Sequence, residues 1–95
     1  MVQYNRDVVY ETEEAKVVIV TLGGHQKTRI HNHDGKESKS LVIKGTVRNE
    51  VFDSDGNLLS YHDCPQGEMF GVGNDLSHRV SNLFKGKAVI LNIYM

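Results

Sequence analysis

Short runs of β-branched and other apolar residues alternate with turn residues along this chain, and no stretch repeats its apolar positions at the helical interval. The clearest two-residue alternation covers residues 46–52, where Val47 and Val51 face the side opposite to Arg48 and Glu50. The five residues that follow, Asp-Ser-Asp-Gly-Asn, predict a hairpin turn. Further strands are expected over residues 17–22, 29–33, 41–44, 58–62, 68–72, 78–81 and 88–95.

Eight or nine short strands in 95 residues predict one all-β domain, residues 1–95, built as a sandwich or a barrel. An immunoglobulin-type sandwich is the alternative, but it gives no reason for the sequence His31-Asn32-His33 in mid-chain. Pro65 is the one proline and is expected between strands. Cys64 beside it is therefore predicted to lie in a turn, and nothing near it in the sequence indicates an activated nucleophile.

Charge and cysteine content limit the class of partner. A formal net charge of -1 gives no reason to expect binding to nucleic acid or to a membrane surface. No apolar run approaches the roughly 20 residues of a membrane span, and the first residues lack the layout of a signal peptide. A single cysteine excludes an internal disulfide and suits a reducing compartment. We therefore expect a cytoplasmic protein with small-molecule partners.

Five histidines are many for this length, and three of them are placed to bind metal. His31 and His33 are two residues apart on an expected strand, so their side chains share a face with Cβ atoms about 6–7 Å apart. Two imidazoles at that separation can bind one ion through metal–nitrogen bonds of about 2.1 Å. His78 begins another strand and is the expected third ligand. His25 and His62 are expected in loops or on the surface.

Residues around these histidines resemble the two sequence motifs of the cupin superfamily. Glu37 follows the H-x-H pair, Gly45 comes later, and His78 stands at H-x-x-x-N spacing to Asn82. The fit departs at Gly45, which comes one residue late, and residues 73 and 75 are not the proline and glycine of the second motif. The resemblance implies a cupin-type β-barrel (a double-stranded β-helix, or jelly roll) that binds a metal.

Within the cupins, the chain is similar over most of its length to the barrel core of the cysteine dioxygenase-like thiol dioxygenases. Five short motifs resemble that family's Y-x-R, G-H, I-H-D-H, H-R-V-x-N and L-H-x-Y. They are Tyr4-Asn5-Arg6, Gly24-His25, Ile30-His31-Asn32-His33, His78-Arg79-Val80-Ser81-Asn82 and Leu91-Asn92-Ile93-Tyr94. Typical members are longer, with extra segments at both ends.

This resemblance implies an iron-dependent enzyme. Fe(II) would be held by His31, His33 and His78, although zinc, nickel, manganese and copper are also possible at such a site. The partners implied are a small thiol substrate and O2, and the product is a sulfinic acid. Arg6 matches the arginine that holds the substrate carboxylate. Tyr94 matches the tyrosine that hydrogen-bonds near substrate and dioxygen.

Some positions differ from the family. Ser38 stands where the animal enzymes carry a cysteine cross-linked to the tyrosine, so that thioether cannot form. Ile90 and Asn92 replace the serine and histidine that support the tyrosine. Proton handling is the step that these replacements affect most.

Glu37 leaves the chemistry open. In ordinary cupins the glutamate after H-x-H is a fourth ligand, which would fill a coordination position and halve the excess charge. Alignment on Gly45 puts Ser38 at the family's cysteine position, and we expect Glu37 to lie outside the metal's ligands. The alternatives are a metal cupin of other chemistry with Glu37 as ligand, or a non-catalytic module that binds a small ligand. Pairing of strand edges into a homodimer is also compatible with the sequence.

Overall fold

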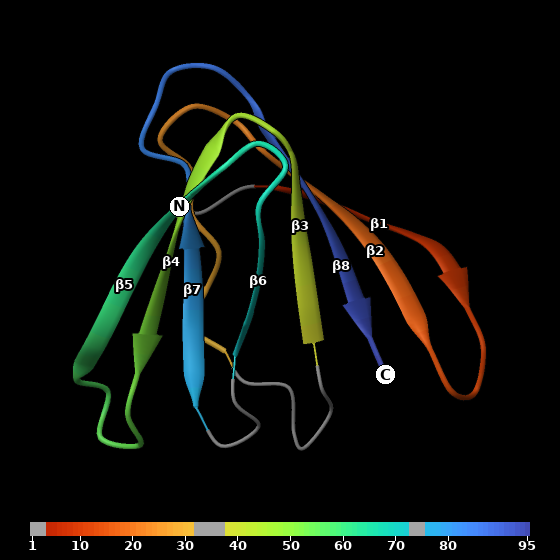
Figure 1. Cartoon of the computed structure of the whole chain (residues 1–95), viewed down its shortest axis with the longest axis horizontal. Coiled ribbons are helices and arrows are strands. Elements are labelled where there is room, and N and C mark those ends of the chain that lie inside the picture. The colour runs from red at the N-terminus through yellow and green to blue at the C-terminus, as the bar shows by residue number, and fades with distance from the viewer. Residues whose placement is uncertain (1–3, 32–37, 73–75) are drawn as a thin grey trace.

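The computed structural model describes residues 4–31, 38–72 and 76–95, and every regular element within them is a β-strand (Figure 1). Short turns join most of the strands, as the hydrophobic pattern predicts. The strand expected over residues 29–33 is not formed in its described part, residues 29–31, where His31 makes an isolated bridge. In chain order they are β1 (Asn5–Glu11), β2 (Lys16–Leu22), β3 (Ser38–Lys44), β4 (Thr46–Phe52), β5 (Leu58–Pro65), β6 (Met69–Val72), β7 (Ser77–Ser81) and β8 (Ala88–Tyr94).

The strands form two antiparallel sheets of order β1-β2-β8-β3-β6 and β5-β4-β7. Figure 1 shows the larger sheet on the right and the smaller one on the left. Residues 27–31 run along β7, with isolated bridges from Lys27 to Ser81 and from His31 to His78. This jelly-roll topology confirms the all-β barrel fold. The described residues include no helix long and apolar enough to cross a membrane.

Buried apolar side chains from both sheets fill the space between them. β2 shows why these residues form a strand, because Val18, Val20 and Leu22 are buried while the residues between them are only half-buried. Fully burying side chains of this kind is worth about 1.5–3 kcal/mol each. The core cluster is Val18, Val20, Leu22, Val42, Val47, Cys64, Val80, Ala88 and Ile90.

The prediction that Cys64 lies in a turn is wrong. β5 continues past the expected end at residue 62, and Cys64 pairs with Val47 of β4 and is fully buried. The error came from Pro65, which ends β5 at the edge of the smaller sheet. A proline is tolerated there because the outer side of an edge strand has no ladder hydrogen bond to lose.

Gly45, the motif glycine, is needed where β3 turns into β4. Its φ is +82°, which favours glycine, and a Cβ atom there would lie 3.1 Å from the carbonyl oxygen of Lys87. The turn lets β3 join the larger sheet and β4 the smaller one. It therefore connects the two layers of the barrel.

Candidate metal centre

Two of the three predicted metal ligands lie against each other. The backbone N–H of His31 donates to the carbonyl of His78 at 2.9 Å, and the reverse bond is 2.8 Å. Their ring centroids are 4.5 Å apart. His78 is 4% exposed and His31 is half-buried. His33, the predicted third ligand, and Glu37, the possible fourth, lie outside the described residues.

Hydrogen bonds set which nitrogen of each ring carries a proton. His31 Nδ1 lies 2.7 Å from the carbonyl oxygen of Arg29, and a carbonyl can only accept, so Nδ1 is the donor. His78 Nδ1 likewise donates to Oδ1 of Asn49 at 2.9 Å. In a neutral imidazole this leaves the lone pair on Nε2, the arrangement usual for metal-binding histidines. The donor set therefore fits a divalent metal such as iron or zinc.

Asn49 was not predicted as a site residue. It lies on β4, is 5% exposed, and shares the inner face of the strand with Val47 and Val51. An amide on the apolar face of an alternating strand needs a partner when it is buried. That mismatch was visible in the sequence, but its partner His78 was not.

Tyr94 lies at the same end of the barrel. In Figure 1, β7 of the smaller sheet begins and β8 of the larger sheet ends at the lower end of the barrel, and His78 and Tyr94 belong to those parts of their strands. Tyr94 packs against the core and stands between Lys16 and Ser38 in the strand register. Ile90, Asn92 and Tyr94 are at alternate positions of β8 and therefore share one face of the strand.

Polar residues surround Tyr94 on the inner face of the larger sheet. Ser40 donates its hydroxyl hydrogen to Oδ1 of Asn92 at 2.6 Å, and Ser38 is buried directly opposite Tyr94. Lys16, which belongs to none of the sequence motifs, also stands opposite Tyr94 and lies 3.8 Å from Glu11. This end of the barrel is therefore polar inside.

Arg6 lies farther along the barrel. Arg6, on β1, stands opposite Val20 of β2, whose side chain is buried in the core. The Arg6 side chain is therefore on the inner face of the larger sheet, although it is exposed. Tyr94 stands opposite Lys16, four residues away from Val20 on β2. At about 3.3 Å per residue the two positions are roughly 13 Å apart along the strands. Arg6 and Tyr94 therefore share the inner face of the larger sheet but are not neighbours.

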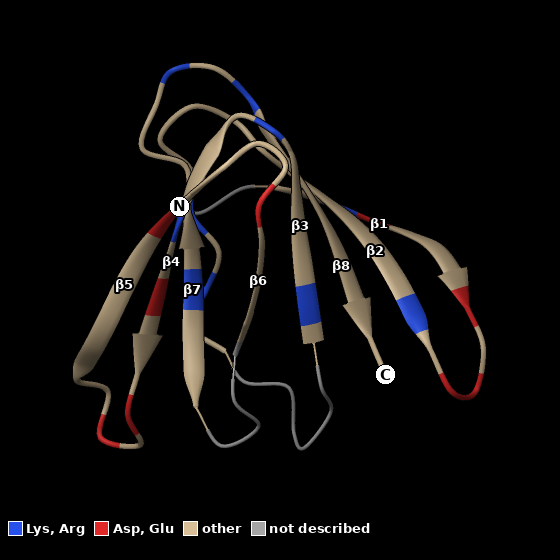
Figure 2. Cartoon of the chain, viewed as in Figure 1, with Lys and Arg blue, Asp and Glu red and all other residues tan. Residues whose placement is uncertain are grey.

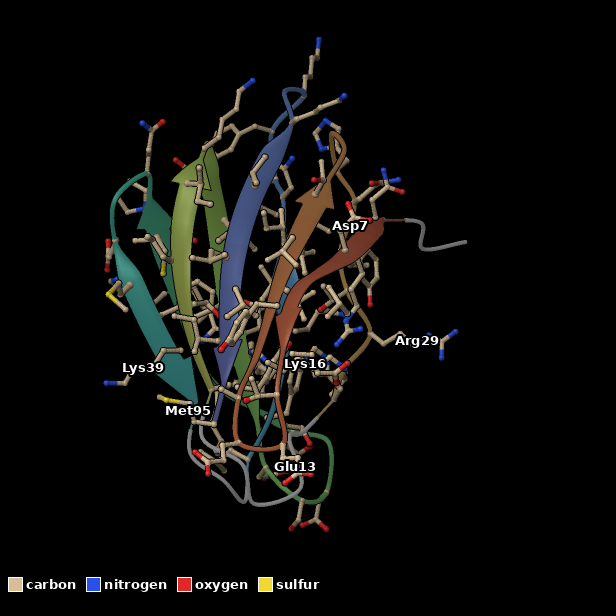
Figure 3. All side chains as sticks on the ribbon, turned by 90° about the vertical axis from the view of Figure 1, so that its right-hand side faces the viewer. Asp7, Glu13, Lys16, Arg29, Lys39 and Met95 are labelled. Carbon is tan, nitrogen blue, oxygen red and sulfur yellow. The ribbon has the colours of Figure 1, made fainter. Side chains whose placement is uncertain are left out.

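Charged residues are distributed unevenly around the barrel. Figure 2 shows acidic residues in the two hairpin turns at the end where β7 begins, and blue residues in the loops at the opposite end. Lys16 and Lys39 are exceptions near the acidic end (Figure 3). The side chain of Arg29, whose carbonyl accepts from His31, points away from the barrel (Figure 3).

Asn82, the asparagine of the second motif, holds loops and does not reach toward the histidines. It is 2% exposed, and its Oδ1 accepts from the N–H of Phe84 at 3.1 Å. Its amide nitrogen donates to three carbonyl oxygens, those of Leu22 (3.2 Å), Gly23 (3.0 Å) and Gly86 (2.7 Å). The side chain thus ties the end of β2 to the loop before β8.

The other two histidines lie outside this centre. His25 is exposed in a loop, as predicted, with φ of +60°. His62 is exposed, but it lies on β5 and not in a loop. Its Nε2 is 2.6 Å from Oε1 of Glu68.

Comparison with known proteins identifies the fold. No protein-family model matches the chain. A protein from Thermus thermophilus has a TM-score of 0.84 at 17% identity, with 97% of this chain and 82% of that chain covered. The Drosophila melanogaster CENP-C cupin domain has a TM-score of 0.85 at 15% identity, covering 97% and 69%. This chain has the cupin fold. An oxalate oxidase is also similar, with a TM-score of 0.76, 19% identity, and coverage of 85% of this chain and 41% of that one.

These likenesses concern the cupin fold and not an activity, because all three identities are low. The expected cupin-type barrel is confirmed. The similarity spans about two fifths of the oxalate oxidase chain. What the site does must be argued from its own residues.

Proposed function

We propose that this cupin barrel is an iron-dependent thiol dioxygenase that oxidises a small thiol carboxylate to a sulfinic acid with O2. The observation that carries the proposal is the pairing of His31 with His78, with both Nδ1 protons donated to oxygen acceptors. A similar structure is an oxalate oxidase, so the fold hosts oxidative chemistry in at least one similar protein. The motif resemblance directs the proposal to thiols.

His31, His33 and His78 would hold the iron. Three neutral imidazoles leave the charge of a divalent ion uncompensated, which favours an anionic thiolate ligand. The iron, when bound, supplies the redox chemistry and the open coordination positions. The protein's part is to keep the two described rings in one tautomer and to bind and orient the substrate.

Tyr94 would orient the reacting atoms. Its position opposite Ser38 supports the alignment that puts Ser38 at the family's cross-linked cysteine, because such a pair must be neighbours. A serine cannot form the thioether, so the Tyr94 hydroxyl would act as an ordinary hydrogen-bonding phenol. Asn92 is held by Ser40 and lies two residues before Tyr94 on the same face.

Arg6 would hold the substrate carboxylate. A guanidinium pairs with a carboxylate through two parallel hydrogen bonds, which fixes orientation as well as charge. Arg6 is on the inner face of β1 and exposed. In the strand register it lies roughly 13 Å from Tyr94, so the substrate would occupy the inner face between these two side chains.

The test is oxygen consumption by the iron-loaded protein. Cysteine and 3-mercaptopropionate should support O2 uptake with formation of the sulfinate, and His78→Ala should abolish uptake and iron binding at this centre. Arg6→Ala should raise KM for these carboxylates and leave cysteamine unaffected. The matched control is Arg29→Ala, which removes an outward side chain but keeps the carbonyl that binds His31.

Two results would overturn the proposal. Absence of O2 uptake with every thiol would exclude thiol dioxygenase activity. Turnover of oxalate instead would favour the second candidate, a metal cupin of other chemistry with Glu37 as fourth ligand, which the oxalate oxidase likeness supports.

A further inference from the structure

A second group of metal-binding atoms lies on β5, outside the histidine pair. His62 and Cys64 are two residues apart on one strand, on the sheet face that they share with Asn49 and Val47 of β4. The turn after Pro65 returns the chain so that Glu68 Oε1 lies 2.6 Å from His62 Nε2. One ligand atom from each of His62, Cys64 and Glu68 lies within 4.8 Å of the others.

We propose that His62, Cys64 and Glu68 form a second site for a thiophilic divalent ion such as Zn2+. Sulfur, imidazole nitrogen and carboxylate oxygen are the three donor types that zinc takes in proteins. Bonds of about 2.0–2.3 Å around a tetrahedral ion put its donors about 3.3–3.8 Å apart. The three atoms lie within 4.8 Å of one another and His62 and Glu68 are 2.6 Å apart, so ion binding would draw the thiol in by up to roughly 1 Å and separate His62 from Glu68 by a similar amount. Water would take the fourth position.

Two of the three proposed ligands are open to solvent and the third is buried. The side chain of His62 is 66% exposed and that of Glu68 is 37% exposed, so an ion can reach them from solvent. Cys64 is fully buried beneath them. A simple surface pair between His62 and Glu68 would be worth little by itself and would need no thiol underneath.

Ion binding would replace the thiol proton. Burial, with the nearby carboxylates of Glu68 and Asp63, raises the pKa of Cys64 to about 11, so the group is a neutral thiol at neutral pH. The bound ion forms the metal–sulfur bond, the S–H bond breaks, and the proton passes to solvent with no change of oxidation state. Affinity should therefore rise with pH.

The position of the site predicts its effect. β5 belongs to the smaller sheet, and Glu68 immediately precedes β6 of the larger sheet (Figure 1). An ion held by all three residues would join the two sheets at this edge of the barrel. It is separated from the first centre by β4, at a distance of the order of 10 Å across two strand spacings, and the two sites share no ligand.

Cobalt(II) absorption tests this site alone. Cys64 is the one cysteine of the chain, so a thiolate-to-cobalt charge-transfer band reports only the second site. We expect the band to saturate at one ion per chain, to strengthen as pH rises, and to be lost in Cys64→Ser and in the double variant His62→Ala with Glu68→Gln.

The controls separate this inference from the proposed function. His78→Ala should keep the band, because His78 belongs to the first centre only. Asp63→Asn should also keep it, because Asp63 faces the other side of β5 and binds Arg48. Zn2+ should raise the Tm of His78→Ala, which has lost the first centre, but not of His78→Ala combined with Glu68→Gln.

Absence of a charge-transfer band at saturating cobalt would overturn the second site. A band that persists after the His62→Ala and Glu68→Gln changes would do the same, because Cys64 would then bind the ion without the proposed partners. His62 and Glu68 are partly or largely exposed, so these two changes should leave the fold intact. Far-ultraviolet circular dichroism checks that the variants are folded.

Discussion

Replacing Asn49 with leucine tests the hydrogen bond that sets the His78 ring. Asn49 is 5% exposed, His78 is 4% exposed, and the bond between Oδ1 and Nδ1 is 2.9 Å. Leucine has the same branched four-atom side-chain skeleton, so the change removes the acceptor without leaving a cavity. Partners of this kind typically account for about 10–100-fold in metal affinity. That range corresponds to about 1.4–2.8 kcal/mol of binding free energy.

Chelator competition with Zn2+ measures the effect. The titration is made in a Cys64→Ser background, so that the second site cannot bind through its thiolate. Asn49→Leu should weaken zinc binding by about 10–100-fold. Asn49→Asp should retain the affinity or increase it, because a carboxylate is a stronger acceptor for the imidazole N–H.

Ser40→Ala is the matched control for this experiment. It removes a buried hydrogen bond, from Ser40 to Asn92, on the inner face of the other sheet, and it should not change zinc affinity. Equal affinity in Asn49→Leu and its parent, within about twofold, would refute the role of Asn49. Should Asn49→Leu fail to fold, weaker binding by Asn49→Asp would contradict the same reasoning.

Two further predictions concern stability. Glu50→Gln should lower the free energy of unfolding by about 1.5–3 kcal/mol at neutral pH, because the half-buried Arg79 loses a carboxylate that accepts two of its hydrogen bonds. Asp63→Asn, which breaks the exposed pair with Arg48, should cause no measurable loss. Hydrogen bonds from Arg79 hold the pKa of Glu50 below its usual 4.5. Denaturant unfolding should therefore show the lower stability of Glu50→Gln above pH 4.5, and the two proteins should become equally stable as pH falls through the folded-state pKa of Glu50. Gly24→Ala should lower Tm, because the new Cβ would lie 2.3 Å from the carbonyl oxygen of Lys85. Gly86→Ala, with open space around the new Cβ, should leave Tm nearly unchanged. Equal changes in Tm for the two variants would contradict the steric argument.

Local chemistry explains why β4 and its turn could be predicted from sequence. The alternation over residues 46–52 matches β4 at both ends. The turn after it is closed by Asp53, whose carboxylate accepts from the N–H groups of Asp55 and Asn57, both at 2.9 Å. These bonds lower the pKa of Asp53. Everything needed for this hairpin lies within a few residues.

Elements that depend on distant partners could not be predicted in the same way. β1 has all seven residues exposed and shows no buried face, so the hydrophobic pattern predicts no strand there. Its structure comes from pairing with β2. The contacts of His62 with Glu68 and of Asn49 with His78 could not be predicted for the same reason. Periodicity predicts which face of a strand carries a side chain, but not which residue of another segment contacts it.

The motif around β7 shows how much of the sequence evidence is about chemistry and how much is about the fold. His78 lies at the candidate metal centre and Val80 is in the core. On the opposite face, Arg79 and Ser81 both bind Glu50 of β4. Asn82 then ties two loops together through its buried amide.

Four of the five residues of this motif therefore have structural contacts that any barrel of this design could use. The motif supports the fold and one metal ligand, but it does not by itself specify a thiol substrate. That specificity depends on Arg6 and Tyr94, which come from β1 and β8 and lie outside the motif. The Arg6→Ala comparison between carboxylate thiols and cysteamine is consequently the measurement that separates a thiol dioxygenase from another metal-binding cupin.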